Sequence, residues 1–441
     1  MAWPLQISTH PVCPIRTFAI AIVVLTHASL SYAIVSGFAY TGSPNAPTGL
    51  KRFNVEEVGI AVLAEAFPLE KIRAVLKATE REGKRKRQLP ATMMMYYVIA
   101  LGLFVSVGCR EVLRRLLGGV MWIWPNEIRV ATESAITQAR KRLGAAPMVR
   151  LYCEQVVPIA KKITRGAWFR RWRVVTLDGT TLDVADTEKN EAAFGRPGAA
   201  RGRSAYPQTR VVGFVENGTH VVFGAEMDRC DVGEVTIAYR MLKLLRRNML
   251  CLADRNFVNY PLWKEASGRG AALVWRASTR LVLPKLRKLA DGSYLAKFYP
   301  SAKHRQQDRE GISVRLIDYR IDGSGETYRL MTNILDPEQA PAIELARLYS
   351  ERWTIETALD EIKTHLRGRG IVLRSKLPEL VRQDVYGLLL AHFGVRVIMH
   401  DAALSEDIST EELSFVHTLR VVHRKLPWFV SFSPSGTQPH G

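Results

Sequence analysis

Four residues in the last quarter of the chain have side chains suited to phosphate chemistry, in the pattern Y-x2-R-x3-E-x6-K. They are Tyr349, Arg352, Glu356 and Lys363. At about 100° per residue, a helix over 345–366 would place all four in a stripe about 60° wide, at the edge of an apolar stripe. This arrangement indicates a helix that lines a pocket, although an i,i+4 ion pair between Arg352 and Glu356 explains the spacing equally well.

Two aspartates follow short apolar runs that are typical of buried strands. Asp178 comes after the run 173–177, and Asp254 follows the run 248–253. Because ligands sit at the carboxyl ends of strands in an α/β sheet, we expect a site at both positions. For either aspartate alone, a helix cap or a turn is the commoner role. Together with Glu356, they predict three converging carboxylates.

Three carboxylates without a matching set of histidines or cysteines favour a hard cation. Mg²⁺ takes oxygen ligands and usually keeps waters and substrate phosphates. The predicted chemistry is phosphoryl transfer with two Mg²⁺ ions, for which Mn²⁺ is a substitute, and with water or a DNA 3′-hydroxyl as nucleophile. The five cysteines show no zinc spacing and fit a reducing cytosol. No P-loop or Rossmann motif indicates ATP or a nicotinamide cofactor.

The elements that must position these acids follow a simple order. They are strands over 173–177, 209–216 and 220–227, a helix over 232–247, a strand over 248–253, a helix over 260–267 and a strand over 271–276. This order resembles the α/β ribonuclease H-like fold, a mixed sheet with helices. In that fold the first and fourth strands carry catalytic acids, and a later helix supplies the third.

Three sequence blocks make the resemblance specific: LDGTTLDV around Asp178, LADRNF around Asp254 and YSERWTIETALDEIK around Glu356. Over roughly residues 51–426 the chain resembles the DDE transposases of the bacterial insertion-sequence-four family. The family implies that these three acids are the catalytic metal ligands. It also implies contacts to the phosphates of the transposon end from the other residues of the stripe: Tyr349, Arg352 and Lys363.

The resemblance further implies cut-and-paste transposition, commonly through a hairpin at the transposon end, within a protein dimer. The expected partners are the terminal inverted repeats and target DNA, in the bacterial cytoplasm at the nucleoid. Asn256 stands where the family often has glycine, and asparagine tolerates the same left-handed backbone. A nuclease of the same fold without strand transfer and a non-catalytic DNA-binding protein are the alternatives.

Three other acids compete for the ligand positions. Asp360 lies one turn beyond Glu356 beside the same stripe, and only the family spacing favours Glu356. Asp183 and Asp186 lie past the predicted end of the first strand, in a polar, glycine-rich segment. We therefore interpret these two as loop carboxylates.

The charge of the chain indicates an anionic partner. Lys and Arg number 62 against 42 Asp and Glu, a formal net charge of +20. Clusters at 84–87, 140–142, 170–173 and 196–210 favour DNA phosphates over a solvated surface, and binding should weaken steeply with salt. Arg255, beside the second aspartate, is predicted to contact DNA as well.

The region 51–165 is helical in pattern, and the resemblance implies that it binds DNA. An apolar helix over 91–107 is long enough for a core helix and short for a membrane span. A helix over 132–143 begins at Thr132 and, with the helix before it, fits a helix-turn-helix. Three cations on its exposed side would contact DNA: Arg140, Lys141 and Arg142.

Residues 277–337 are too many for an ordinary loop and have the alternation of strands. They resemble the β-rich insertion that family members place before the glutamate helix. Trp275 or Tyr299 would stack there on an unpaired base, although burial in its strand explains Trp275 as well.

The first 50 residues do not fit the rest of the chain. Thr17–Tyr40 carries no charge and is long enough to span a membrane. We expect this leader to be translated upstream sequence outside the fold, without stable membrane association. The predicted organisation is a leader over 1–50, a helical DNA-binding domain over 51–165, a catalytic core over 166–276 and 338–400, a β-rich insertion over 277–337 and a tail over 401–441, with possible dimer or DNA contacts.

Overall fold

The computed structural model describes residues 5–7, 63, 66–83, 88–123, 130–199, 202–321, 326–351, 356–368 and 370–425. The chain divides into two compact units. The sheet unit consists of Met1–Pro14 and Val157–Glu361, and the helical unit consists of Ile15–Val156 and Ile362–Gly441. This division differs from the predicted one, because the N-terminal helices and the C-terminal helices share one unit.

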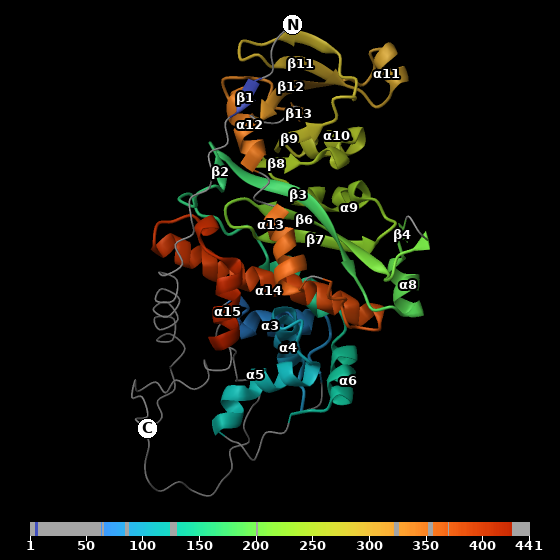
Figure 1. The fold of residues 1–441 in the computed structure, drawn as a ribbon, viewed down its shortest axis with the longest axis vertical. Coiled ribbons are helices and arrows are strands. Elements are labelled where there is room, and N and C mark those ends of the chain that lie inside the picture. The colour runs from blue at the N-terminus through green and yellow to red at the C-terminus, as the bar shows by residue number, and fades with distance from the viewer. Residues whose placement is uncertain are drawn as a thin grey trace, which may run out of the picture. The chain divides into compact units, whose positions relative to one another are not determined.

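Eleven strands form a single mixed sheet in the sheet unit (Figure 1). Its path is β10-β11-β12-β13-β9-β8-β3-β6-β7, with β1 beside β12 and β2 beside β3. The strands are β1 Leu5–Ile7, β2 Trp168–Phe169, β3 Trp172–Asp183, β6 Gln208–Glu216, β7 Val222–Arg229, β8 Met249–Ala253, β9 Ala272–Ala277, β10 Lys285–Lys288, β11 Tyr294–Phe298, β12 Ile312–Ile321 and β13 Thr327–Thr332.

Five consecutive strands at one end of this path have the ribonuclease H-like order that the sequence predicts. In the path β7-β6-β3-β8-β9, β3 pairs antiparallel with β6 and parallel with β8, and β8 pairs parallel with β9. A parallel pair requires a crossover connection, and here the helix α10 (Tyr260–Gly268) joins β8 to β9. The predicted α/β fold class is confirmed.

The first strand is longer than predicted. The run 173–177 is only its first half, because β3 continues to Asp183. The second half pairs with β6 alone, from Asp178 opposite Gly213 to Asp183 opposite Gln208, after the pairing with β8 has ended. Asp178 therefore lies inside a strand, and the prediction that it ends one is wrong.

Helices cover both faces of the sheet. The apolar residues of α12 (Ala342–Glu351) form one core with alternate residues of β3, β8 and β9, such as Val174, Leu252 and Val274. On the other face, α9 (Glu234–Met241) contacts β6 and β7, and α10 contacts β9. The remaining elements of this unit are α8 Glu188–Phe194, α11 Ala302–Gln306, α13 Glu356–Asp360 and the separate ribbon of β4 Gly198–Ala199 with β5 Gly202–Arg203.

The predicted β-rich insertion does not form a separate sheet. Its last strand, β13, pairs antiparallel with β9, and β12, β11 and β10 follow in the same sheet (Figure 1). The insertion thus extends the catalytic sheet beyond its fifth strand. Because β9 has a neighbour on each side, it presents no open edge there.

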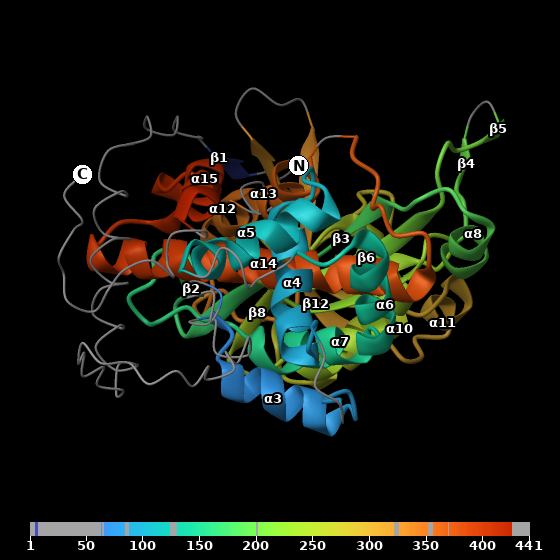
Figure 2. The same ribbon diagram turned by 90° about the horizontal axis from the view of Figure 1, so that it is seen from below.

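The helical unit is built around its longest helix, α14 (Pro378–Ser405). This helix packs against α4 (Ala91–Leu103), α7 (Ala146–Gln155) and α15 (Phe415–Lys425), and Figure 2 shows α4 lying across it. The helices α4 and α14 approach closely because both have glycine at the contact: a Cβ on Gly102 would lie 2.5 Å from the Gly387 carbonyl oxygen. The other helices are α3 Leu69–Ala78, α5 Cys109–Ile123 and α6 Glu133–Leu143.

One described helix, α14, is long and apolar enough to cross a membrane. However, 78% of its apolar 18-residue stretch is buried within the structure. A core helix has the same properties, so α14 is weak evidence for a span. The predicted tail boundary at 401 falls inside this helix. The segment Thr17–Tyr40 lies outside the described residues, whereas Leu5–Ile7 of the predicted leader pairs with β12.

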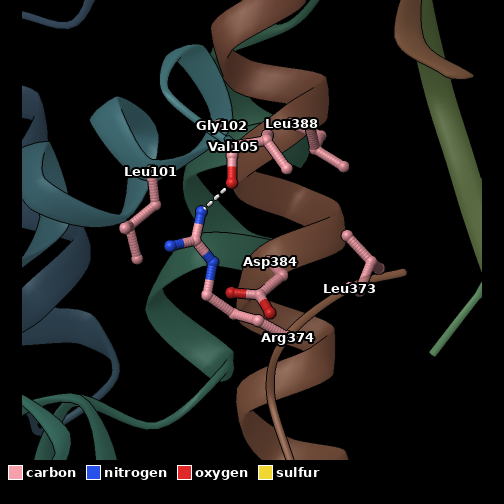
Figure 3. A pocket seen from close by; sticks show the side chains of 7 residues that line it. All are labelled: Leu101, Gly102, Val105, Leu373, Arg374, Asp384 and Leu388. Carbon is pink, nitrogen blue, oxygen red and sulfur yellow. Dashed lines mark hydrogen bonds between the residues drawn. The ribbon is translucent and has the colours of Figure 1, made fainter. Parts of the chain in front are cut away.

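A small pocket in the helical unit lies between α4 and the start of α14 (Figure 3). Arg374 and Asp384 are its charged lining residues, and the Arg374 guanidinium donates to the carbonyl of Val105. Arg374 also donates to Val107, so it ties the chain after α4 to the segment before α14. We interpret this arginine as a structural link.

Candidate active site

The two predicted aspartates lie side by side at the centre of the sheet. In the parallel ladders, Leu177 of β3 is opposite Ala253 of β8, and Ala253 is opposite Trp275 of β9. The next residue on each strand is Asp178, Asp254 and Arg276. Because neighbouring strands lie about 4.8 Å apart, these three residues form a row across the sheet about 10 Å long. We call Asp178, Asp254 and Arg276 the acid row; its first two members are acids and the third is an arginine.

All three members of the acid row face the same side of the sheet. Successive side chains of a strand alternate between faces. Val174, Leu252 and Val274 belong to the core shared with α12, and the acid row follows them at even spacing on β3, β8 and β9. Asp254 has an extended backbone (φ −77°, ψ 168°), so it continues the alternation of β8. The acid row therefore lies on the α12 face.

The carboxylate of Asp254 is not used within the described structure. Asp254 precedes the 3-10 helix η3 (Arg255–Phe257), yet its side chain makes no capping hydrogen bond. Its Oδ1 is buried and has no hydrogen-bond partner among the described residues. A buried acceptor without a partner is costly, which indicates a ligand for it. The alternative role, a helix cap, is therefore not observed for Asp254.

Asp178 is half-buried, and its Oδ1 accepts a hydrogen bond of 2.9 Å from the backbone nitrogen of Gly179. The two acids that competed with it lie elsewhere. Asp183 occupies the other face of β3 by alternation and accepts from Gln208 at 2.7 Å. Asp186 pairs with Arg196. The interpretation of both as loop carboxylates is wrong for Asp183, which is the last residue of β3, and fits Asp186, which follows the strand.

The third predicted ligand, Glu356, is the first residue of α13, and α13 contacts β3, the strand of Asp178. Of the helix predicted over 345–366, the structure describes α12 up to Glu351, α13 from Glu356 and a π-helical segment, η5, over Glu361–Leu366, and 352–355 lie outside the described residues. A π turn is wider than an α turn, so the 60° stripe computed for an α-helix does not extend to Lys363.

The other residues of the glutamate region have mixed outcomes. The side chain of Glu356 and all of Arg352 lie outside the described part of the structure. Lys363 is exposed on η5, and Asp360, the competitor of Glu356, is exposed at the end of α13. The assignment of Glu356 as the third ligand stays a prediction.

Tyr349 is placed differently from the expectation. Its side chain is only 2% exposed, and its hydroxyl donates a hydrogen bond of 3.2 Å to the carbonyl oxygen of Ala253. A side chain enclosed in this way cannot contact a DNA phosphate, so that prediction is wrong for this structure. Tyr349 instead joins α12 to the residue directly before Asp254.

Arg276 is a site residue that the sequence reasoning missed. It is half-buried, and its guanidinium carbon lies 4.6 Å from the centre of the Tyr328 ring. No carboxylate among the described residues pairs with it. The signal was available: the strand of Trp275 was predicted, and its next residue must face the opposite side of the sheet, toward the acids.

Trp275, which was predicted to stack on a base, is fully buried. Its ring packs edge-on against Trp263 of α10, with ring centroids 5.0 Å apart. The structure contradicts the stacking prediction, because neither face of the indole is accessible. Tyr299 is half-exposed and donates its hydroxyl to Asp308, so it remains the aromatic candidate in the insertion.

The three cations predicted on α6 separate into two kinds. The helix starts as predicted, with Thr132 accepting from the nitrogen of Ala135. Arg140, however, is 4% exposed and donates from all three of its nitrogens, including a 2.7 Å ion pair with Asp384 of α14. The prediction that Arg140 contacts DNA is therefore wrong. Lys141 and Arg142 are exposed, as is Arg255 beside Asp254.

The chemistry of the donors around the acid row suits a hard cation. Cys251 of β8 faces the opposite side of the sheet from Asp254 by alternation, and burial raises the pKa of its thiol to about 12, so the thiol is neutral near pH 7. Carboxylate oxygens are the ligands that this position offers, and Mg²⁺ and Mn²⁺ prefer oxygen. The described residues include no group of three metal-ligating side chains, and the side chain of Glu356 is not among them.

Two protein-family models match the chain. Residues 57–153 match the N-terminal region of insertion element 4 transposases, and residues 171–393 match the transposase DDE domain. The second match covers half of the chain and contains every member of the acid row. A DDE domain is ribonuclease H-like and implies an enzyme that acts on DNA and uses divalent metal ions.

Individual proteins agree with these models. The chain is 28% identical over 358 residues to the transposase InsG of insertion sequence element IS4 from Escherichia coli (strain K12). The aligned region covers 79% of this chain and 79% of InsG. It is 25% identical over 216 residues to the putative transposase InsZ of the same organism, covering 48% of this chain and 70% of InsZ. Among solved structures, a piggyBac transposase synaptic complex with hairpin DNA matches 86% of this chain and 81% of its own, with 12% identity and a TM-score of 0.45. The family models and the relationship to InsG show that the chain belongs to the IS4 family of DDE transposases.

Proposed function

We propose that the acid row is the catalytic centre of a cut-and-paste transposase. Asp178 and Asp254, together with Glu356 of α13, would hold two Mg²⁺ ions, with Mn²⁺ as a substitute. The observation that carries this proposal is the adjacency of two carboxylates, one in β3 and one directly after the parallel neighbour β8, the second with a buried oxygen that has no partner among the described residues. Divalent ions bound there would lower the pKa of an attacking water and stabilise charge on the reacting phosphate.

The residues around the acids have separable roles in this proposal. Arg276 lies beside Asp254 and has no acidic partner in the described part of the chain. It would bind an oxygen of the DNA phosphate, because a guanidinium matches phosphate geometry. Tyr349 fixes the end of β8 through the Ala253 carbonyl and so positions Asp254. The remaining predicted DNA contacts are Arg352, Lys363, Arg255, Lys141, Arg142 and Tyr299.

The reaction would be two kinds of phosphoryl transfer at the ends of the mobile element. First, water attacks the phosphodiester bond at a terminal inverted repeat: a bond forms between its oxygen and phosphorus, and the 3′ oxygen leaves and takes a proton. The freed 3′-hydroxyl would then attack a phosphodiester of the opposite strand, which gives a hairpin end and releases the flanking DNA with a 3′-hydroxyl. Water would open the hairpin by breaking the new phosphodiester bond, and the 3′-hydroxyl would attack a phosphodiester of target DNA, whose own 3′ oxygen leaves and takes a proton. A homodimer would hold the two ends together, at the nucleoid in the bacterial cytoplasm.

The test is an assay of duplex DNA that carries the element end and flanking sequence, with the protein and Mg²⁺. Nicked, hairpin and joined products are separated on denaturing gels, and metal binding is measured separately by calorimetry. We expect all three products, which are lost with EDTA and restored by Mn²⁺. Glu356→Gln should stop cleavage and leave binding to the end sequence largely intact. Cleavage without joined products would identify a nuclease, and wild-type cleavage by Glu356→Gln would refute the third ligand.

A further inference from the structure

A dense group of cations surrounds the start of β3. Asp178 lies further along the same strand. Six lysines and arginines fall within 161–173, and no acid occurs from Gln155 to Leu177. Like charges so close together repel one another and destabilise the folded chain. Their concentration indicates an anionic partner unless nearby acids neutralise them.

Nearby acids neutralise only part of the group. Arg173 pairs with the buried Glu216, which also accepts hydrogen bonds from the backbone. Arg170 donates to Glu344 and to the carbonyls of Glu338 and Gln339. These two arginines are structural: they fix the β2–β3 hairpin to the rest of the sheet unit.

Two further cations near the hairpin, Lys162 and Arg171, are exposed and are held over aromatic rings. Lys162 Nζ lies 4.0 Å from the centre of the Trp168 ring, and the guanidinium carbon of Arg171 lies 4.6 Å from the Trp172 ring. Trp168 is itself held by a 2.8 Å hydrogen bond to the carbonyl of Lys161. Among the described residues no acid pairs with Lys161, Lys162 or Arg171. We call Lys161, Lys162, Trp168 and Arg171 the hairpin patch.

The backbone of the hairpin is also unusual. Trp168 pairs with Arg173 and Phe169 with Trp172, so the loop consists of Arg170 and Arg171 alone. Arg170 has a φ of 53°, in the left-handed region where two-residue loops favour glycine, asparagine or aspartate. A bulky residue in that conformation costs free energy, and such exceptions concentrate at functional positions. Here the strained loop places Arg171 outward over Trp172.

We propose that the hairpin patch binds the phosphate backbone of duplex DNA, outside the catalytic centre. Unpaired cations held over aromatic rings are suited to phosphates, since less side-chain freedom is lost when an already ordered cation binds. Arg171 and Asp178 are seven residues apart along the chain, about 23 Å at strand spacing, or about seven base pairs of B-DNA. The hairpin patch therefore contacts a stretch of DNA separate from the reacting phosphate. This inference rests on the DNA-binding function of the chain and does not require the metal site.

The test measures binding of Lys162→Gln/Arg171→Gln to duplex DNA carrying the element end, in EDTA, over a series of salt concentrations. Glutamine keeps part of each stem over its ring and removes the charge. Two lost phosphate contacts should lower the slope of log affinity against log salt by about 1.8 and the affinity at 0.1 M salt by about 60-fold. Because EDTA removes divalent ions, the outcome is independent of the proposed catalytic centre.

The matched control is Lys264→Gln/Arg269→Gln on α10, which covers the opposite face of the sheet. Both residues are exposed, at 62% and 44%, and the control removes the same net charge. We expect the control to keep the wild-type slope, and Lys162→Arg/Arg171→Lys to keep it as well. Equal losses in the hairpin variant and the control would overturn the proposal, as would unchanged DNA binding. Unchanged DNA binding with a loss of dimers in light scattering would assign the patch to a second copy of the chain.

Discussion

Each unit has an arginine beside an aspartate, and the two arginines differ in how many hydrogen bonds they make inside the fold. Arg140 of the helical unit donates to Gln383, Ser375, the Leu380 carbonyl and Asp384. Arg276 of the sheet unit lies on the strand next to Asp254, yet the described structure has no ion pair between them. The contact that the described structure shows for its guanidinium is with the ring of Tyr328. The first arginine has all of its nitrogens used inside the fold. The second is held in place with its donors available.

This difference shows why a cation that is prominent in the sequence need not be functional. Arg140 belongs to a basic cluster and was predicted to contact DNA, whereas Arg276 is an isolated cation in an apolar strand. A polar group whose hydrogen bonds are complete stabilises the fold, and one left incomplete beside another incomplete group indicates a ligand.

Asp254→Asn should lower the rate of end cleavage by about 10³-fold or more, because a metal ligand contributes several kcal/mol to stabilising the transition state. The free energy of unfolding should stay within about 0.5 kcal/mol of the wild type, since no internal hydrogen bond is lost. Single-turnover cleavage and urea unfolding measure the two effects. Wild-type cleavage by this variant would remove Asp254 from the catalytic centre.

Arg140→Met should have the opposite profile. Removing one partner of a buried ion pair leaves Asp384 uncompensated and lowers the free energy of unfolding by about 3–5 kcal/mol. The protein that remains folded should bind DNA with unchanged affinity and salt dependence. Lys141→Met, an exposed neighbour, is the control and should change stability by less than about 0.5 kcal/mol. A loss of salt dependence in Arg140→Met, without a loss of stability, would reverse the assignment.

Arg276→Gln should lower end cleavage by about 10- to 100-fold while leaving stability close to the wild type. The expected size corresponds to one charge-assisted hydrogen bond, about 1.5–3 kcal/mol. Arg276→Lys keeps the charge and should recover part of the rate. If Arg276→Gln instead unfolds as readily as Arg140→Met, the two arginines are equivalent and the contrast fails.

Tyr349→Phe tests the smallest difference, between positioning an acid and holding DNA. The lost hydrogen bond should cost about 0.5–1.5 kcal/mol of stability. Cleavage should require a higher Mn²⁺ concentration, because the end of β8 is less well fixed, while the affinity for DNA in EDTA stays unchanged. A lower DNA affinity with a shallower salt slope would restore the phosphate contact that the family resemblance implied.

The sequence was sufficient for the order of the core elements and for the position of Asp254 directly after β8. Short apolar runs mark β8 and β9 because both strands are buried on two faces. The second half of β3 was missed because its residues, Gly179 to Asp183, are mostly polar and pair with β6 alone. Local composition cannot show that a polar stretch has a strand beside it.

The hydrogen-bond partners of individual side chains were the other feature that the sequence could not predict. Arg140 and Asp384 are separated by 244 residues, so no local pattern joins them. The bond between Tyr349 and Ala253 likewise connects residues 96 positions apart. Spacing on a helix predicts which side chains share a face, but whether that face meets a core or a ligand depends on the tertiary fold.

The parallel pairing of β3 with β8 also has a consequence for how the protein is made. Asp178 and Asp254 are 76 positions apart, and a ribosome adding 5–20 residues per second needs about 4–15 s to pass from one to the other. During that interval one edge of β3 has no neighbour and is open to other chains. A chain interrupted between them has Asp178 without Asp254 and an open edge of β3, so the proposed metal site is incomplete at least until β8 has been made.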